Sequence, residues 1–299
     1  MNKTLLIDGG IGRVICAIPA LERFVQKHPE TTIVTYGWTQ LLWGNKLLTD
    51  KVFDNTTKGL FQRIRNTQII KPEPYYNIDY INERTHLIAA FNQEINGDKD
   101  PVGLPKIYLS STELASAAQL RKYTNGRKVV AFQPLGSTAK IDGETVIDTS
   151  VRSLNTETIK YLVNRLKRDY ALFLVTDQQI GFLSQDDFIP VVPSDVRGLA
   201  AILANCDYIL AIDSSAQHIA RCFNKPGSII LGGTNATNAT YPDHYNIIND
   251  VKDKKYMPYR FAEFEWHLAE LENGNLLNFT KQQLDEITTN ITKHIKSTT

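Results

Sequence analysis

The sequence predicts an α/β protein built of two doubly wound domains that face each other across a cleft. The chain has 299 residues, more than one small core needs and suited to two domains of about 100–200 residues each. In both halves, short apolar runs of the buried-strand type alternate with stripes of apolar residues at helical spacing. This alternation indicates parallel sheets, whose ligands bind outside the carboxyl ends of the strands. We therefore expect one Rossmann-like domain over residues 1–124 and a second over 125–299.

The first domain opens as a strand, a turn, a helix and a second strand. Thr4 to Ile7 is a short apolar run, and residues 8–12 (Asp-Gly-Gly-Ile-Gly) form a tight turn. Thr31 to Tyr36 supplies the next strand. Between about residues 51 and 103 the periodicity weakens, so we expect irregular loops and short helices there. The helix behind the turn is predicted by an apolar stripe, namely Val14, Ile18, Leu21 and Val25.

The second domain repeats this alternation more regularly. A helix is expected over the stripe from Ile159 to Leu166, and Asp195 is expected to cap another that reaches Ala204. A last helix over residues 280–296 belongs to this domain and is positioned to pack back on the first. The expected strands are Lys128 to Phe132, Ala171 to Val175, Phe188 to Val192, Tyr208 to Ile212 and Ser228 to Leu231.

Composition excludes several classes of protein. The formal net charge is +1, so no global field attracts nucleic acid or acidic membranes, and such a contact would need a local patch. No apolar run approaches the roughly 20 residues that cross a bilayer, and the first apolar run is too short for a signal peptide. The three cysteines are widely spaced and form no Cys-x-x-Cys pair, which suits a reducing compartment. We expect a cytoplasmic protein without a metal site.

The strongest candidate site is a cradle for an anion such as a diphosphate. The apolar strand that ends at Ile212 is followed by Asp213, and Ser214 and Ser215 then open a helix. The next strand runs into residues 232–234 (Gly-Gly-Thr). Free N–H groups and the positive end of the helix dipole favour an anion at such a point. The alternatives are that Asp213 only caps the helix and that His218, one turn in, is a packing residue.

Two glycine-containing turns are weaker candidates. The turn at residues 8–12 lacks the Gly-x-Gly-x-x-Gly spacing of a dinucleotide fingerprint, so it either lets a helix and strand pack closely or brings backbone up to a substrate. The second turn, residues 133–137 (Gln-Pro-Leu-Gly-Ser), follows a strand, and Lys140 and Arg152 lie downstream. These cations would neutralise phosphate oxygens, or the segment is an ordinary surface loop.

One acidic motif matches a pattern that chelates a metal-bound diphosphate in some transferases. Asp98 and Asp100 flank Lys99, but Asn, Gly and Pro surround them and mark a solvated turn. No other cluster of His, Cys, Asp or Glu has metal-ligand spacing. We predict that the protein uses no metal.

Three stretches of the chain carry a family resemblance: GGIGRVICAIPAL (9–21), VAFQPLGS (130–137) and CDYILAIDSSAQHIARCFNKPGSIILGGTN (206–235). They resemble the opening segment, the linker-proximal strand and loop, and the D-S/T-G-x-x-H-x-A-A…P…L-x-G-x-T signature of family 9 glycosyltransferases. This group is typified by the ADP-heptose:lipopolysaccharide heptosyltransferases. The resemblance covers both halves of the chain. It implies a GT-B fold, with an acceptor-side first domain and a sugar-nucleotide-binding second domain, and inverting transfer that needs no metal.

The resemblance also implies roles for individual residues. Asp213, Ser214 and Ser215 would hold the donor sugar and its diphosphate, with Gln217 and His218 in support. Arg152 falls near the position of a family lysine that stabilises the leaving diphosphate. Other residues implied to contact the donor are Gly10, Gly12, Gln133, Gly136, Ser137, Thr176, Asp177, Gln178, Gly233, Thr234 and Asn235.

The sequence departs from the family at the position of the catalytic aspartate, where it has Arg13. Arginine stays protonated and cannot act as a general base. Asp8, at the end of the first strand, is then the nearest candidate base, or Arg13 binds a phosphate of the acceptor. A second departure is Ser215, which stands where the family has glycine and narrows the pocket.

The function that follows is sugar transfer from a nucleoside-diphosphate donor to an acceptor hydroxyl. The acceptor is lipopolysaccharide, another glycan, or a hydroxymethylated base in DNA as in phage DNA modification. Two basic runs would contact the phosphates if the acceptor is DNA. Several aromatic residues would support a base that has left its stack, as a base must to react. The alternatives are an inactive sugar-nucleotide-binding protein and, less favoured, a nicotinamide oxidoreductase. The residues considered for DNA are Lys58, Arg63, Arg65, Lys252, Lys254, Lys255, Arg260, Trp38, Trp43, Tyr75 and Tyr76.

Overall fold

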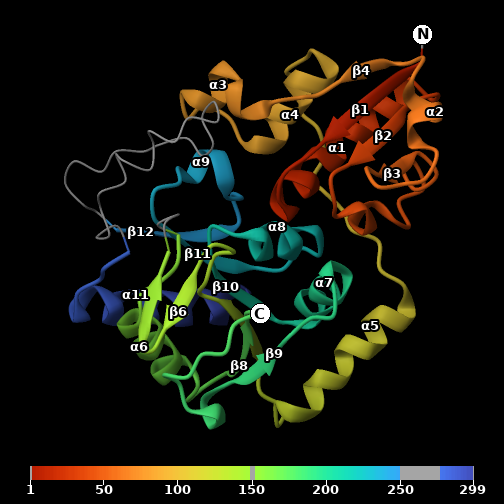
Figure 1. The fold of residues 1–299 in the computed structure, drawn as a ribbon. Coiled ribbons are helices and arrows are strands. Elements are labelled where there is room, and N and C mark those ends of the chain that lie inside the picture. Colours follow the sequence, from red (N-terminus) through yellow and green to blue (C-terminus); the bar gives the residue numbers. More distant parts are fainter. Residues whose placement is uncertain (1, 149–151, 250–276, 299) are drawn as a thin grey trace.

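The structure is a computed structural model that describes residues 2–148, 152–249 and 277–298. Two parallel sheets, one from each half of the chain, are flanked by helices and lie one above the other (Figure 1). The predicted α/β class with two doubly wound units is therefore confirmed. The basic run that contains Lys252, Lys254, Lys255 and Arg260 lies outside the described residues.

The first sheet has four strands in the order β3-β2-β1-β4, all parallel. The prediction for residues 51–103 missed two of them, β3 and β4, because each has only three residues and shows no periodicity. The elements of this half are β1 (Lys3–Ile7), α1 (Ile11–Lys27), β2 (Thr32–Thr35), the 3₁₀ helix η1 (Thr39–Leu42), β3 (Val52–Asp54), α2 (Leu60–Ile64), β4 (Gln68–Ile70), η2 (Pro74–Tyr76), α3 (Ile78–Ile81), α4 (Leu87–Asn96), α5 (Ser111–Ala118) and η3 (Gln119–Tyr123).

The second sheet has six parallel strands in the order β12-β11-β10-β5-β8-β9. All five predicted strands are present, whereas β12 and the small hairpin of β6 and β7 were not predicted. The elements are β5 (Val129–Gln133), β6 (Lys140–Asp142), β7 (Thr145–Ile147), α6 (Thr156–Leu166), β8 (Ala171–Val175), η4 (Gln185–Asp187), β9 (Ile189–Val191), α7 (Val196–Asn205), β10 (Tyr208–Ile212), α8 (Ser215–Cys222), β11 (Gly227–Leu231), α9 (Ala236–Ala239), β12 (His244–Ile248) and α11 (Lys281–Thr298).

Local sequence explains why these segments form where they do. β8, β10 and β11 are buried at every position, as expected of strands covered by helices on both faces of a parallel sheet. The predicted cap of α7 is confirmed, because the Asp195 carboxylate accepts a hydrogen bond from the Gly198 N–H at 2.7 Å. Because β5 pairs in parallel with both β8 and β10, the carboxyl ends of these three strands meet at one edge of the second sheet.

Two helices pack in ways that bear on the predicted domain boundary. α5, which precedes residue 124, packs against α7 of the second half, and Arg121 pairs with Asp207 at 2.8 Å. α11 packs against α6 and β12 through Ile291 and Ile295, whereas we expected it to be positioned to pack back on the first domain (Figure 1). The buried apolar residues of α11 pack into the same hydrophobic core as those of α6. The boundary at residues 124 and 125 stays a prediction.

The two halves also meet where α1 packs against α8. A Cβ atom added at Gly12 would lie 2.7 Å from Cδ2 of His218, so the absence of a side chain there permits the contact. Farther along, the Asn238 side-chain amide donates hydrogen bonds to the backbone oxygens of Tyr80 and Thr85, at 2.9 and 3.0 Å. The glycine turn thus serves close packing between the halves as well as facing the cavity described below.

Replacing Gly12 by alanine is expected to destabilise the protein by about 1–3 kcal/mol, because the new methyl group collides with the buried His218 ring. Gly10→Ala is the matched control: Gly10 has φ of −80° and no atom within 4 Å of the added Cβ. We expect that control to cost less than about 1 kcal/mol. Urea unfolding of both variants checks this, and equal losses would contradict the contact.

Among the described residues, no helix is both long and apolar enough to span a membrane.

Candidate functional site

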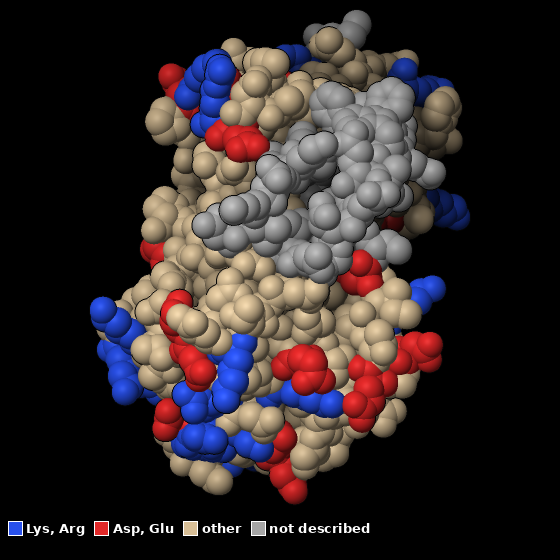
Figure 2. All heavy atoms as spheres, turned by 90° about the vertical axis from the view of Figure 1, so that its left-hand side faces the viewer, with Lys and Arg blue, Asp and Glu red and all other residues tan. Residues whose placement is uncertain are grey.

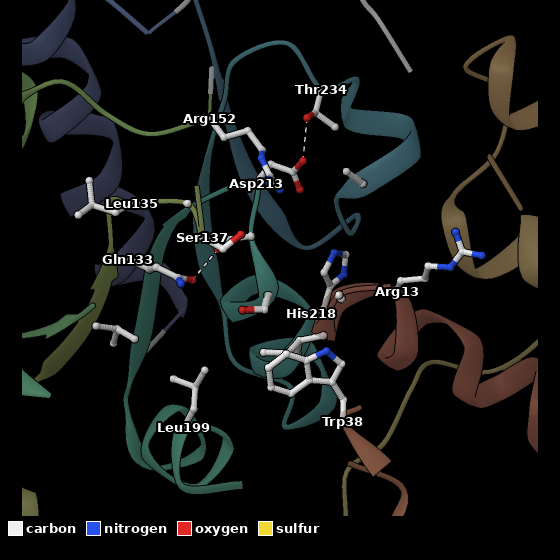
Figure 3. A pocket seen from close by; sticks show the side chains of 18 of the residues that line it. Arg13, Trp38, Gln133, Leu135, Ser137, Arg152, Leu199, Asp213, His218 and Thr234 are labelled. Carbon is white, nitrogen blue, oxygen red and sulfur yellow. Dashed lines mark hydrogen bonds between the residues drawn. The ribbon is translucent and has the colours of Figure 1, made fainter. Parts of the chain in front are cut away.

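A cavity of about 480 Å³ lies where the two halves face each other (Figure 3). Its second-half wall is formed by the residues that follow β5, β8, β9, β10 and β11. Its first-half wall is formed by the glycine turn and by residues from the loops after β2 and β4. The cavity therefore collects most of the segments that the sequence singled out, although they are spread along the chain from Gly10 to Thr234.

The start of α8 forms the floor of the predicted cradle. Ser214 precedes the helix and donates its hydroxyl hydrogen to the Gln133 side-chain oxygen at 2.6 Å. The same oxygen accepts the Ala216 N–H at 3.3 Å, so Gln133 satisfies one of the free N–H groups of the helix. Ser215 lines the cavity, and no hydrogen bond of its hydroxyl is seen within the described residues. Of the two serines, Ser215 is thus the one whose hydroxyl is available to a ligand.

Asp213 is held rigidly at the end of β10. One carboxylate oxygen accepts from the Gln217 side-chain amide at 2.7 Å, and the other accepts from the Thr234 hydroxyl at 2.7 Å (Figure 3). Asp213 does not cap α8, since the N-cap is Ser214. Its carboxylate lines the cavity with the orientation fixed by two neighbours. Gln217 itself is fully buried, so its part is to orient Asp213.

The loop after β5 and one cation complete the second-half wall. Gly136 and Ser137 line the cavity, and the Gly136 N–H is bound by the Ser153 hydroxyl at 2.8 Å. Arg152 also lines the cavity, and its side chain extends toward Asp213 in Figure 3. Lys140 lies on β6, is exposed and does not line the cavity. The structure therefore brings one of the two predicted cations to the site.

The remaining predicted donor contacts separate into two groups. Thr176 and Asp177, after β8, line the cavity, whereas the Gln178 side-chain amide is bound to the backbone oxygen of Ala139 at 2.6 Å. Thr234 lines the cavity, but Gly233 does not. Asn235 also lies outside the lining: it caps α9 through the Thr237 N–H and donates to Glu83 of the first half.

Arg13 lines the cavity and is part of a largely buried ionic network. Its guanidinium donates to both carboxylate oxygens of Glu73, at 2.9 and 3.1 Å, and lies 3.0 Å from Asp8. It also donates to the backbone oxygen of Pro72 at 3.1 Å, and in Figure 3 it points away from the other labelled side chains. Burial alone would lower the pKa of Arg13, but the bond to Glu73 and the nearby negative charges raise it.

Asp8 is paired with two cations. Its carboxylate lies 3.0 Å from Arg13 and 3.0 Å from Lys71, and Asp8 is not among the residues that line the cavity. Burial would raise the pKa of Asp8, yet the hydrogen bond from Lys71 and the charge of Arg13 outweigh it and lower the pKa. A lower pKa makes the carboxylate a weaker base. The catalytic roles of Asp8 and Arg13 stay predictions.

His218 is a neutral, buried residue at the contact between the halves. Its Nδ1 lies 2.9 Å from the Tyr241 hydroxyl and 3.6 Å from the Cys16 sulfur. Burial lowers the pKa of His218 to about 3. Burial likewise lowers the pKa of His86 to about 3 and that of His244 to about 4. At neutral pH all three imidazoles are therefore uncharged.

These histidines are expected to make stability fall with acidification. Each has a folded pKa below the unfolded value near 6.5, so below that pH the unfolded chain binds more protons than the folded one. The stabilisation that comes from keeping these histidines neutral is therefore complete above about pH 6.5. As the pH falls toward 4, each histidine lowers the free energy of unfolding by about 1.4 kcal/mol per pH unit. Urea unfolding at several pH values measures the slope. His244→Phe should reduce it, because both His244 ring nitrogens are buried without hydrogen bonds; an unchanged slope would contradict this.

The acidic motif at residues 98–100 is occupied by structural ion pairs. Asp98 lies 3.0 Å from Arg23 and 3.3 Å from Lys27, and Asp100 lies 2.8 Å from Arg23. These pairs tie the segment to α1, in agreement with a solvated turn. Within the described residues, no group of three or more His, Cys, Asp or Glu side chains is arranged to hold a metal ion.

Several lining residues were not identified as donor contacts from the sequence. Many of them come from elements whose position no local pattern reveals, such as η2, α3 and the loop after β9. For some of them, an apolar residue placed at the end of a predicted strand or just after it could have indicated a ligand contact. Val192 and Trp38 are such residues, and the structure leaves them 76% and 38% exposed. The additional residues are Ile11, Trp38, Tyr75, Tyr80, Leu87, Leu135, Val175, Val192, Pro193, Leu199, Asn238 and Ala239.

The fold, with two facing parallel sheets and a ligand-sized cavity between them, is that of the GT-B glycosyltransferases. The most informative similarities are to family 9 enzymes. A family 9 glycosyl transferase from Veillonella parvula superposes with a TM-score of 0.64 at 12% identity, covering 99% of this chain and 97% of that chain. The predicted GT-B fold and the structural resemblance to family 9 are thereby confirmed.

Two enzymes from E. coli show the same similarity. ADP-heptose lps heptosyltransferase II has a TM-score of 0.62 at 12% identity, over 98% of this chain and 99% of that chain. Heptosyltransferase WaaC, solved with ADP, has a TM-score of 0.55 at 12% identity, over 99% of this chain and 100% of that chain. No family sequence model and no curated protein matches the chain. At this identity the similarity establishes the fold, and function must be argued from the site.

Proposed function

We propose that this protein is a metal-independent, inverting glycosyltransferase that moves a sugar from a nucleoside-diphosphate donor to an acceptor hydroxyl. One observation carries the proposal. A single cavity between two lobes gathers the start of α8, the Gly136–Ser137 loop, Arg152 and the fixed carboxylate of Asp213. That combination offers positive potential beside one negative group, which suits a donor that becomes an anion and a cation as its bond breaks.

The diphosphate is proposed to bind at the start of α8. The N–H groups of the first turn and the Ser215 hydroxyl are donors there, and the helix dipole adds positive potential. Arg152 supplies a full positive charge on the same wall. As the nucleoside diphosphate leaves, its negative charge grows, and fixed donors of this kind stabilise the transition state without reorganising.

The sugar is proposed to lie against Asp213. A carboxylate would repel the diphosphate, so its suitable partners are sugar hydroxyls and the positive charge that develops on the ring in the transition state. Gln217 and Thr234 keep both of its oxygens in position. Thr176 and Asp177, on the far side of the cavity, are proposed to contact the ribose or base of the nucleotide.

Transfer also requires a group that takes the proton from the acceptor hydroxyl. Arg13 cannot accept a proton, and Asp8 is shared between Arg13 and Lys71, with a lowered pKa. We keep Asp8 as the proposed base, acting late, when bond formation has already made the acceptor hydroxyl more acidic. Arg13 is proposed to orient Asp8 rather than to bind an acceptor phosphate, because its guanidinium donors face Asp8, Glu73 and Pro72.

Thermal-shift measurements with ADP, GDP and UDP test the donor site, since a ligand at 100 times its dissociation constant stabilises the folded state by about 2.7 kcal/mol. Ser215→Asp is the diagnostic variant. A carboxylate at the first position of a helix interacts favourably with the helix dipole, so the variant should stay folded. At this position, however, it would repel a diphosphate and abolish the thermal shift. Ser111→Asp is the matched control, since Ser111 is the first residue of α5, outside the cavity. No shift with any nucleotide, or a shift that survives Ser215→Asp, would refute the proposed donor site.

The second candidate is a sugar-nucleotide-binding protein without transfer activity. The observation that favours it is the pairing of Asp8 with two cations, which weakens the proposed base. This candidate predicts a thermal shift with nucleoside diphosphates but no release of nucleotide from any UDP-, ADP- or GDP-sugar, with or without acceptors. Release of nucleotide that depends on an acceptor would exclude it.

A further inference from the structure

A strained loop after β2 presents an aromatic ring to the cavity. Gly37 and Trp38 both have left-handed backbone conformations, with φ of 81° and 61°. Glycine adopts this conformation readily, but for a bulky residue such as tryptophan it is strained. Strain of this kind persists when surrounding structure enforces it, and it is concentrated at functional sites.

The surrounding structure does enforce it. The Thr35 and Thr39 hydroxyls are 2.5 Å apart, and the Thr39 hydroxyl donates to Asp54 at 3.2 Å, so both sides of the loop are tied together. From the second half, Arg197 donates to the backbone oxygen of Gln40 at 2.8 Å. Trp38 is nevertheless 38% exposed and lines the cavity, so the loop holds a tryptophan ring where a ligand can reach it.

The charges on this wall of the cavity are already compensated. Of the described residues that line the cavity, Arg13 is the cation from the first half, and Asp8 and Glu73 neutralise it. Lys71 is likewise paired with Asp8. On the face in Figure 2, the described Lys and Arg side chains intermingle with Asp and Glu rather than forming a single basic surface. Such a wall does not favour a polyanion, since nucleic acids bind through phosphate contacts with Lys and Arg.

We propose that Trp38 is the acceptor-binding platform and that the acceptor is an uncharged carbohydrate whose ring stacks on the indole. This inference rests on the proposed function and specifies its acceptor. An indole offers a large apolar surface with a negative face, to which the C–H face of a sugar ring is complementary, while the sugar hydroxyls remain at the rim. Trp38 stands on the first-half wall, and the proposed donor groups stand on the second, so a stacked ring would lie between the two.

Binding of the 299-residue protein to three probes tests the proposal: neutral oligosaccharides, sulfated oligosaccharides, and duplex DNA that contains 5-hydroxymethylcytosine. Each is measured with and without the nucleotide that gives the largest thermal shift. We expect binding to neutral oligosaccharides, weakened about tenfold or more by Trp38→Ala and largely kept by Trp38→Phe. Trp43→Ala is the matched control, because Trp43 is 49% exposed on the same segment but does not line the cavity.

The outcomes separate this inference from the proposed function. Nucleotide binding together with a neutral-glycan signal that Trp38→Ala leaves unchanged would overturn the platform and keep the donor site. Binding of the sulfated probe or the DNA in preference to neutral glycans would overturn the acceptor class. If the wild-type protein binds no nucleotide at all, the proposed function is refuted. Comparing Trp38→Gly with Trp38→Ala separates folding from binding: both variants lack the ring and should weaken glycan binding, but glycine relieves the left-handed strain, so Trp38→Gly should melt at a higher temperature than Trp38→Ala.

Discussion

Replacing Arg13 by alanine is expected to cost about 3 kcal/mol of folding stability or more, the largest effect of any single substitution considered. The side chain is 5% exposed and is bound by Asp8, Glu73 and the backbone oxygen of Pro72. It also lies over the rings of Tyr75 and Phe91, at 5.1 and 5.6 Å from their centroids. Its removal would take the paired cation from Glu73, leave Asp8 with Lys71 alone, and open a gap between α1 and α4.

Arg23→Ala is the control for this prediction, because Arg23 lies on the same helix and pairs with Asp98 and Asp100 at the surface. Exposed ion pairs contribute little, so its loss should cost less than about 1 kcal/mol. Urea unfolding of both variants provides the comparison. Similar losses for the two arginines would mean that the network at Arg13 is not the structural element we describe.

Replacing Arg152 by glutamine is expected to lower the rate of sugar transfer by about 10²–10³, the effect typical of losing one group that stabilises charge in the transition state. The side chain would remain long and polar, but the positive charge that we propose to face the leaving diphosphate would be gone. Folding should be little affected. The measurement is steady-state nucleotide release from the donor that binds best, with kcat and KM determined separately.

Lys140→Gln is the matched control for charge. Lys140 is exposed on β6 and does not line the cavity, although the sequence made it an equal candidate. Its substitution should change the rate by less than about twofold, since solvent and salt screen a charge at that distance. Equal effects at both positions would show that long-range potential, and not contact with the diphosphate, is what matters.

The sequence predicted the second half of the fold best. Strands such as Tyr208–Ile212 are continuous apolar runs bounded by polar residues, and Asp195 is a clear helix cap, so local chemistry suffices. β3 and β4 escaped prediction because three-residue strands are specified by their neighbours in the sheet and not by their own pattern.

The candidate site could be predicted where a strand end meets a helix start, as at Asp213 and Ser215. It could not be predicted where the decisive contact is tertiary. Nothing near Arg13 in the sequence indicates that Glu73 will bind it, and nothing near Asn235 indicates that its side chain will reach Glu83. Long-range polar partners of this kind depend on how the two halves come together, which local periodicity does not encode.

The amide at position 133 has a consequence for the electrostatics of nucleotide recognition. A glutamate there would have the same shape and accept the same two hydrogen bonds from Ser214 and Ala216, yet it would bring a full negative charge to the helix start. The neutral glutamine secures the turn and leaves the helix's attraction for an incoming anion uncancelled. Replacing that one amide nitrogen with oxygen would therefore be expected to weaken phosphate binding at the proposed donor site while leaving the fold unchanged.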